Sequence, residues 1–223
     1  MTKIKAVIFD LDGTLVNAYK AVERSMNYAL AKSGFPTVSA YTIKRSVGWG
    51  DRQLIEGFVG KKNAPRVLEI YRKHHTGSLK DGVTFLPGAK RLLETLGKRG
   101  YILAIATNRP ERFTRIILKV LQIEKCFDYV LCGDKIKRPK PYPDMLKLIL
   151  KKYGLSVHEA LYVGDMTIDV KTGNSARVRT VAVLTGSSTR EEIAALKPFE
   201  IIPRISQVTK IIRDLESNPK KGK

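Results

Sequence analysis

The sequence has few cysteines and no long apolar run. Its 223 residues include two cysteines, Cys126 and Cys132, and neither belongs to a CxxC motif or a Cys/His cluster. We therefore expect reduced thiols, not a disulfide framework or a zinc site. No apolar run approaches the roughly 20 residues that a membrane span requires. The apolar stretch near the start is short and is interrupted by Asp10 and Asp12, unlike a secretory signal peptide. We expect a cytoplasmic protein without a membrane anchor.

Acidic residues are also scarce: 21 Asp and Glu stand against 41 Lys and Arg, a formal net charge of +20. Such an excess can attract an anionic substrate, nucleic acid or a membrane surface. The basic residues are scattered, apart from the lysines at 220, 221 and 223, and no nucleic-acid-binding motif accompanies them. We expect a small anionic substrate and no nucleic-acid partner. The sequence leaves open whether the protein is a monomer or a homodimer.

Short apolar runs alternate with amphipathic helical patterns along the chain. The runs, at 4–9, 101–106, 129–132, 160–163 and 180–184, are typical of parallel strands buried on both faces. Helical patterns lie between several of them, at 89–99, 112–121 and 145–153. The alternation predicts an α/β fold, namely a doubly wound parallel sheet with a Rossmann-like core.

About 70 residues separate the first predicted strand from the next α/β unit. This stretch has helical patterns at 19–30, 42–47, 51–59 and 64–75, and no convincing strand. We therefore predict an all-helical cap inserted into the core directly after the first strand. The predicted parts are a core of residues 1–15 and 87–216, a cap of residues 16–86, and a flexible basic tail of residues 217–223.

Polar side chains follow three of the predicted strands at the point where each strand ends. These residues are Asp10 and Asp12, then Thr107 and Asn108, then Asp165 and Asp169. In open α/β sheets the ligand lies beyond the carboxyl ends of the strands, at the switch point of the strand order. We expect these side chains to converge there. Lys140 precedes a predicted helix and could bring a cation to the same edge.

The residue types indicate phosphate chemistry. Crowded carboxylates repel one another unless a cation compensates them, and hard oxygen ligands suit Mg²⁺. Asp10 could then act as a covalent nucleophile, and Asp12 could exchange a proton with the leaving group and later with water. Lys140 and the Thr107 hydroxyl could hold the phosphoryl oxygens, where charge must be stabilised during transfer.

Four motifs in this order resemble those of the haloacid dehalogenase-like superfamily. The DxDGT motif matches 10–14, its Ser/Thr motif matches Thr107, its lysine matches Lys140, and its GDxxxD motif matches 164–169. The resemblance implies that Asp10 is the nucleophile and Asp12 the general acid/base. It also implies that Mg²⁺ is held by Asp10, the backbone carbonyl of Asp12, and Asp165. Asp169 would then orient a metal-bound water or pair with Lys140.

The helical insert is similar to the cap of the phosphoglycolate phosphatase and beta-phosphoglucomutase-like branch. Within it, 47–51 resembles the glycine-containing loop that reaches into the site, although Asn17 stands where an acidic residue is frequent. Arg45 and Arg52 are candidate cations for a substrate carboxylate. Trp49 fits a packing residue better than a substrate contact. We expect the three histidines to be structural or surface residues outside the site; they are His74, His75 and His158.

Together these features predict a Mg²⁺-dependent phosphatase that hydrolyses a small phosphorylated metabolite through an aspartyl-phosphate intermediate, with phosphoglycolate as the leading substrate. A phosphomutase of the beta-phosphoglucomutase type would keep every motif and stays open. A 2-haloacid dehalogenase would need neither a metal nor a second aspartate at position 12. A non-catalytic basic binding protein would not need the full set of carboxylates.

Overall fold

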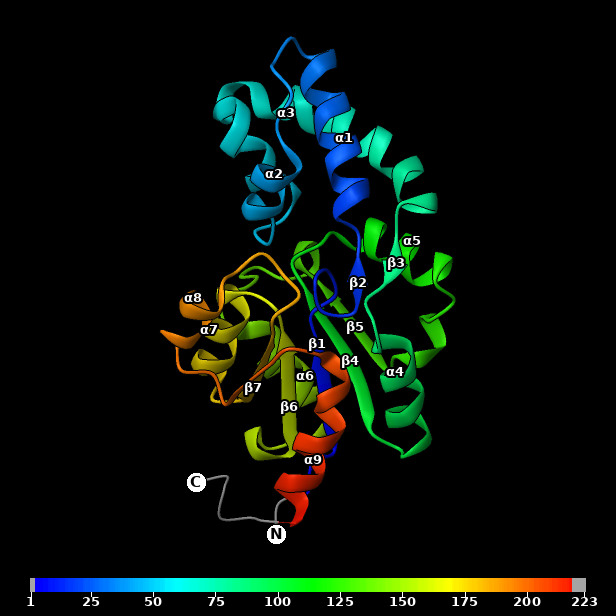
Figure 1. Ribbon diagram of the computed structural model, residues 1–223, viewed down its shortest axis with the longest axis vertical. Coiled ribbons are helices and arrows are strands. Elements are labelled where there is room, and N and C mark those ends of the chain that lie inside the picture. The colour runs from blue at the N-terminus through cyan, green and yellow to red at the C-terminus, as the bar shows by residue number, and fades with distance from the viewer. Residues whose placement is uncertain (1–2, 218–223) are drawn as a thin grey trace.

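A sheet of six parallel strands forms the centre of the molecule (Figure 1). The computed structural model describes residues 3–217. The strand order is β5-β4-β1-β6-β7-β8. The strands are β1 (Ala6–Phe9), β4 (Ile102–Thr107), β5 (Tyr129–Cys132), β6 (Ala160–Gly164), β7 (Arg179–Val183) and β8 (Glu200–Ile202). The order reverses at β1, which pairs with β4 on one side and with β6 on the other. The predicted fold class is confirmed.

Helices cover both faces of this sheet, because alternate strand residues point to opposite sides. Val7 and Phe9 pack with residues of α4 (Ala89–Lys98), α5 (Glu111–Val120) and α9 (Val208–Ser217). On the other face, Ala6 and Ile8 pack with α6 (Asp144–Tyr153), and α7 (Thr167–Ala176) and α8 (Arg190–Ala194) pack further along the sheet. Short 3-10 helices complete the core: η1 (Glu124–Cys126), η2 (Gly133–Lys135), η3 (Val157–Glu159) and η4 (Ile205–Gln207).

Three helices form a separate unit over the carboxyl edge of the sheet (Figure 1). They are α1 (Tyr19–Lys32), α2 (Ala40–Ser46) and α3 (Asp51–Asp81). The unit has its own apolar cluster, to which Met26, Ile43 and Ile55 contribute. Gly60 breaks α3 with φ +73°, a conformation that glycine adopts without steric penalty. The two parts of α3 correspond to the helical patterns predicted at 51–59 and 64–75.

The prediction that the insert contains no strand was wrong at its two ends. Strands β2 (Val16–Asn17) and β3 (Thr84–Phe85) pair antiparallel, with Val16 opposite Phe85 and Asn17 opposite Thr84. Two residues are too few to give an alternating pattern, so only the meeting of distant segments reveals these strands. We call this pair the stem. It joins the helical unit to the core (Figure 1).

The first residue of the predicted flexible tail belongs to a helix. Ser217 is the last residue of α9, and its hydroxyl donates a hydrogen bond to the carbonyl of Arg213 at 2.9 Å. The rest of the predicted flexible tail, 218–223, lies outside the described residues. Within residues 3–217, no helix is both long enough and apolar enough to cross a bilayer.

Candidate active site

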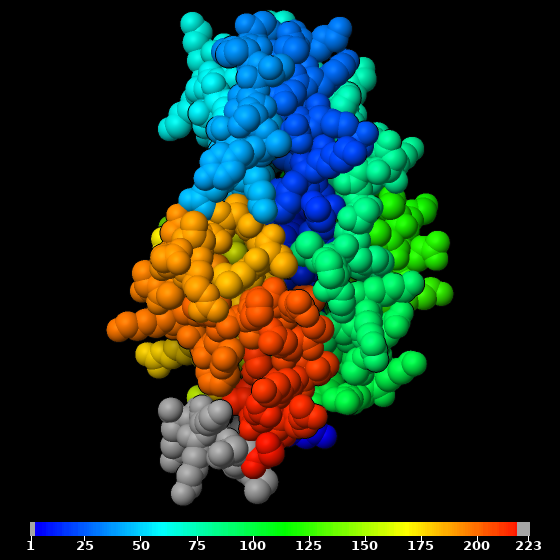
Figure 2. Space-filling view, viewed as in Figure 1, coloured from blue at the N-terminus to red at the C-terminus, as the bar shows by residue number. Residues whose placement is uncertain are grey.

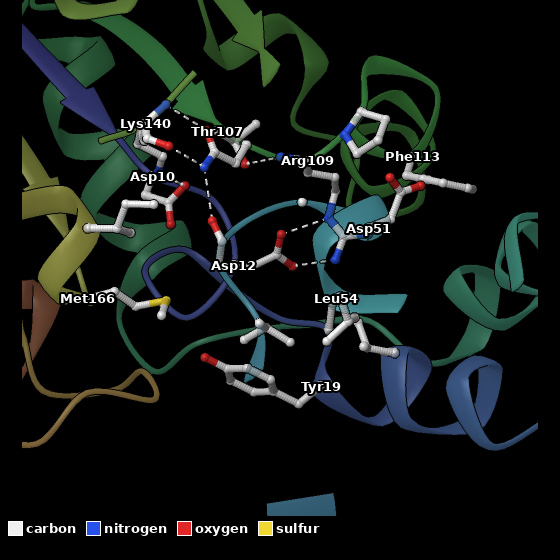
Figure 3. Close-up of a pocket in the computed structure, with 18 of the residues that line it drawn as sticks. Asp10, Asp12, Tyr19, Asp51, Leu54, Thr107, Arg109, Phe113, Lys140 and Met166 are labelled. Atoms are coloured by element: carbon white, nitrogen blue, oxygen red, sulfur yellow. Dashed lines mark hydrogen bonds and ion pairs between the residues drawn. The ribbon is translucent and has the colours of Figure 1, made fainter. Parts of the chain in front are cut away.

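A pocket opens where the carboxyl ends of β1 and β4 face the helical unit (Figure 3). It contains about 690 Å³ of space between atoms, part of it open to solvent. The structure brings five of the predicted site residues to its walls: Asp10, Asp12, Thr107, Asn108 and Lys140. The pocket therefore lies at the switch point of the sheet, where the sequence predicted it.

Asp10 and Lys140 form a buried ion pair at the base of the pocket. The Nζ atom of Lys140 lies 2.8 Å from Oδ1 of Asp10 and 2.7 Å from Oδ1 of Asp169. The Tyr162 hydroxyl also donates to Oδ1 of Asp169, at 2.7 Å. Burial raises the pKa of Asp10 to about 7, although Lys140 opposes this shift. Burial alone would lower the pKa of Lys140, but Asp10 and Asp169 outweigh it, so the amine stays charged.

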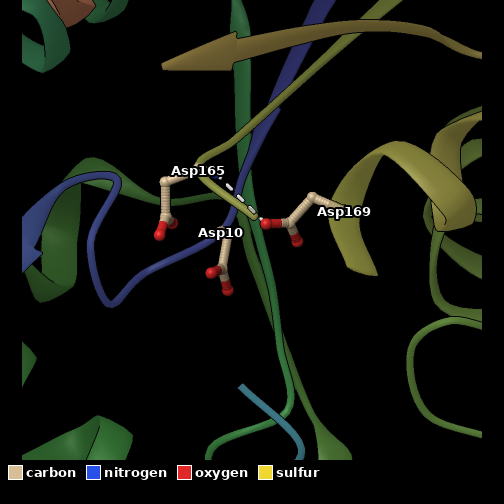
Figure 4. A group of neighbouring side chains, drawn as sticks. All are labelled: Asp10, Asp165 and Asp169. Carbon is tan, nitrogen blue, oxygen red and sulfur yellow. Dashed lines mark hydrogen bonds between the residues drawn. The ribbon is translucent and has the colours of Figure 1, made fainter. Parts of the chain in front are cut away.

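Three buried carboxylates meet beside this pair (Figure 4). Asp10, Asp165 and Asp169 each offer an oxygen, and these oxygens lie within 4.8 Å of one another. Oδ1 of Asp165 accepts a hydrogen bond from the Thr14 hydroxyl at 2.6 Å. Its Oδ2 is buried and has no hydrogen-bond partner within residues 3–217. Burial, followed by the charges of Asp10 and Asp169, raises the pKa of Asp165 well above its usual range.

These features fit a divalent cation. A buried oxygen without a partner is energetically unfavourable, and a cation would satisfy it and offset the repulsion between the carboxylates. Glycines keep space open at that oxygen, because a Cβ atom at Gly13 or Gly186 would collide with Oδ2 of Asp165. Gly13 also has φ +81°, a conformation that favours glycine. A donor set made of oxygens suits Mg²⁺.

The side chain of Asp12 lies outside this cluster and pairs with an arginine. Asp12 accepts hydrogen bonds from Nε and Nη2 of Arg109 at 2.7 and 2.8 Å, a bidentate arrangement (Figure 3). Burial would lower the pKa of Arg109, but Asp12 outweighs it and raises the pKa. Sequence reasoning missed this arginine, because the segment 107–110 fits an ordinary helix start. Its position two residues beyond Thr107, at a strand end, was the available signal.

We expected His75 to lie outside the site, but the structure places it next to a residue of the pocket wall. It is fully buried in α3, and its Nε2 atom lies 2.9 Å from Nη1 of Arg109. Its Nδ1 atom lies 3.0 Å from the Ser25 hydroxyl oxygen. Burial lowers the pKa of His75 to about 2, and the charge of Arg109 adds to this shift. The imidazole is therefore neutral, and it joins the cap to the Arg109–Asp12 pair.

Thr107 and Asn108 form hydrogen bonds with the segments of Lys140 and Arg109 and with the cap loop at Gly48. The Asn108 side-chain amide donates to the carbonyls of Gly48 and Lys140, both at 3.0 Å, and accepts from the Lys140 backbone N–H at 2.9 Å. It therefore fixes the lysine segment and contacts the cap loop. Thr107 Oγ1 accepts from the Arg109 backbone N–H at 3.1 Å and can donate its own hydrogen into the pocket.

Neither of the cap cations suggested by the sequence lines the pocket. Arg45 reaches across to the core, where its guanidinium lies 2.6 Å from Glu192 Oε1 and also donates to the Ser187 carbonyl. In Figure 2 the light-blue part of the cap meets the orange part of the core in this region. Arg52 is exposed and lies 3.8 Å from Glu56. The expectation failed because helical periodicity does not say which side of a helix faces another domain.

Trp49 also lies outside the pocket, although glycines on both sides of it line the pocket wall. Its side chain is 48% exposed, so it is not buried as a packing residue would be.

The chain is similar to known proteins along nearly its whole length. The family model described as haloacid dehalogenase-like hydrolase matches residues 7–183. A phosphoglycolate phosphatase of Mannheimia succiniciproducens is 30% identical over 223 residues, covering 95% of this chain and 99% of that protein. One of Pseudomonas syringae pv. tomato is 29% identical, covering 96% and 81%. The crystal structure of a predicted phosphoglycolate phosphatase from Haemophilus somnus superposes with a TM-score of 0.88 at 28% identity, covering 95% and 99%.

The chain therefore belongs to the haloacid dehalogenase-like hydrolase family, as the four motifs suggested. Within that family it lies in the phosphoglycolate phosphatase-like branch. The enzyme class that this membership defines is a phosphoric monoester hydrolase.

Proposed function

We propose that this phosphatase depends on Mg²⁺ and hydrolyses a small phosphorylated acid of the phosphoglycolate type through an aspartyl-phosphate intermediate on Asp10. The observation that carries the proposal is the buried group of Asp10, Lys140 and Asp165, in which one carboxylate oxygen has no partner among residues 3–217. The names of the relatives support the choice of substrate.

In this proposal Asp10 attacks phosphorus with one carboxylate oxygen, and the bond from phosphorus to the leaving oxygen breaks. Lys140, already 2.8 Å from Asp10, and the Thr107 hydroxyl stabilise the charge on the phosphoryl oxygens. Asp12 gives a proton to the leaving oxygen and later takes one from the water that cleaves the aspartyl-phosphate. Mg²⁺, held by Asp10, Asp165 and the backbone carbonyl of Asp12, would supply positive charge beside the phosphoryl group.

We further propose that residues 16–86 act as a cap that closes over the phosphate. Asn108 from the core and Gly48 from the cap already share a hydrogen bond, and Arg109 and His75 share another. A closed cap excludes bulk water and completes the walls around the leaving group. The cytoplasmic location, and the choice between monomer and homodimer, stay predictions.

The test is an assay of p-nitrophenyl phosphate and 2-phosphoglycolate with Mg²⁺ and after exhaustive chelation. We expect both to be hydrolysed only with the metal, and phosphoryl groups to be trapped on the wild-type protein after acid quench but not on Asp10→Asn. Full activity after chelation would disprove the metal requirement. Transfer of the phosphoryl group to a sugar phosphate, in place of phosphate release, would favour the phosphomutase.

A further inference from the structure

The pocket has a second cation besides Lys140, and it comes from the core. The cap side of the pocket is mostly apolar, with Val22, Leu54 and Tyr71 among its residues. Its one acidic residue, Asp51, is held by Arg72 in two hydrogen bonds of 2.7 and 3.0 Å. Among the described residues that line the pocket, Arg109 and Lys140 are the only arginine and lysine.

Hydrogen-bond counting shows that Arg109 has donors to spare. A guanidinium carries five N–H groups in a fixed plane. Asp12 takes one from Nε and one from Nη2, and His75 takes one from Nη1. Within residues 3–217 no acceptor is found for the remaining N–H on Nη1 or on Nη2. One N–H on each of the two terminal nitrogens is therefore left over, and a pair of N–H groups at the end of the fork is the arrangement that binds a carboxylate bidentately.

His75 fixes the orientation of this fork. Because the imidazole is buried and neutral, its Nε2 lone pair can accept the hydrogen bond from Nη1. The ring is itself held by the Ser25 hydroxyl and packs against Tyr71 and Phe113. The guanidinium is thus fixed by Asp12 and His75, and Arg109 is among the residues that line the pocket.

We infer that Arg109 binds the carboxylate of the substrate through the remaining N–H groups on Nη1 and Nη2, while its Nε side holds Asp12. This inference rests on the proposed function, because it uses Asp12 as the residue that protonates the leaving oxygen. One guanidinium then contacts both Asp12, which protonates the leaving oxygen, and the substrate carboxylate. The carboxylate must therefore lie close to the ester oxygen, so the substrate class is the phosphate ester of a small 2-hydroxy acid.

The apolar residues beside the fork agree with this class. Phe113 and Leu54 offer no polar group and Tyr71 adds a single hydroxyl, so this wall has no charge for a second phosphate and few partners for several hydroxyl groups. A short carbon chain that carries one carboxylate matches the Arg109 fork on one side and the apolar wall on the other. A sugar phosphate would leave most of its hydroxyl groups without partners at this wall.

The wild-type enzyme provides the first test. The specificity constant kcat/KM is measured for 2-phosphoglycolate, for its neutral amide phosphoglycolamide, and for p-nitrophenyl phosphate, all with Mg²⁺. We expect the acid to exceed the amide by roughly 10- to 100-fold, as for the loss of charge-assisted hydrogen bonds. A ratio near one overturns the inference. The proposed function fails separately, if p-nitrophenyl phosphate is not hydrolysed at all.

The second test compares two variants with the same change of charge. Arg109→Gln should slow every substrate, because Asp12 loses its partner, and should also bring the ratio of acid to amide close to one. The matched control is Arg112→Gln, since Arg112 is exposed on α5 and lies outside the pocket. It should leave the ratio unchanged. A ratio that Arg109→Gln does not alter overturns the inference.

Thermal denaturation shows whether Arg109→Gln is folded. If it is not, Arg109→Lys decides the question, because lysine keeps the charge but not the fork. We expect it to lower the ratio of acid to amide by about tenfold, and an unchanged ratio again overturns the inference.

Discussion

The core and the cap contribute different kinds of residue to the pocket. From the core come Asp10, Asp12 and the two cations, placed in the segments that follow β1, β4 and β5. From the cap come mainly apolar walls, a neutral histidine behind Arg109, and Asp51, whose charge is paired. Under the proposed function, the charged residues of the core carry out the chemistry, whereas the cap shapes the space for the leaving group.

The largest expected effect is on the core. Asp10→Asn should lower kcat by at least about 10⁴-fold, because an amide cannot serve as the nucleophile. The matched cap variant is Asp81→Asn, a carboxylate that is exposed and pairs with Arg24. It should keep wild-type kcat. Steady-state assays of both variants at saturating Mg²⁺ check this, and measurable turnover near the wild-type rate in Asp10→Asn would remove Asp10 from its role.

The next largest effect concerns the space beside Asp165. Gly186→Ala should raise the Mg²⁺ concentration for half-maximal activity by roughly 10- to 100-fold, the range seen when groups around metal ligands are disturbed. The added Cβ would press on Oδ2 of Asp165. Gly97→Ala is the control, since that helical glycine has nothing within 4 Å of its Cβ position. Calorimetric titration with Mg²⁺ checks the affinity directly. Equal affinity in the two variants would place the metal elsewhere.

A moderate effect is expected on stability, through the histidine of the cap. The pKa of His75 is about 2 in the folded protein and 6.5 when unperturbed. Between these values the unfolded chain binds a proton that the folded protein does not, so stability falls as the pH drops below about 6.5. The contribution of this one group is about 1.4 kcal/mol per pH unit.

Urea unfolding between pH 4.5 and 7.5 measures this contribution. His75→Gln should be less stable near neutral pH but should show a flatter decline toward acid. The control is His158→Gln at an exposed histidine, and its profile should run parallel to that of the wild type. A profile of His75→Gln that also runs parallel would mean that the imidazole is not held neutral in the folded state.

The smallest effect is expected at the contact between the cap and the core that Arg45 makes. Arg45→Gln and Glu192→Gln should each change kcat/KM by less than about fivefold, because exposed ion pairs contribute little. The change should be equal for 2-phosphoglycolate and p-nitrophenyl phosphate, and it should shrink at high salt. A loss confined to the phosphorylated acid would show that Arg45, and not Arg109, faces the substrate carboxylate.

The parts of the site that could be predicted from sequence are those on regular elements. Asp10 and Thr107 follow apolar strands, so their convergence follows from the rules of parallel sheets. Arg109 could not be found in this way, since its role depends on the partners that the fold brings to it, namely Asp12 and His75. His75 itself lies 34 positions from Arg109 in the chain, and no local pattern connects them.

The fold, too, has parts that follow from local sequence patterns and parts that depend on tertiary neighbours. The short apolar runs predicted five strands of the sheet, but the edge strand β8 has only three residues and the two strands of the stem have two each. Such short segments have no period to detect, and they become strands only because a neighbour is present. Arg45 was placed wrongly for a related reason: its direction depends on how α2 sits against α8, which is a tertiary property.

The stem has a consequence for how enzymes with this core can diversify. Because Val16 lies opposite Phe85, the chain enters and leaves the helical unit at a single point, and the order of the six main strands does not depend on what lies between. A two-residue hairpin turn could close the same ladder. Other helices inserted between the two strands would leave and re-enter the core at the same point, and they would change the walls of the pocket while keeping the carboxylates that follow β1.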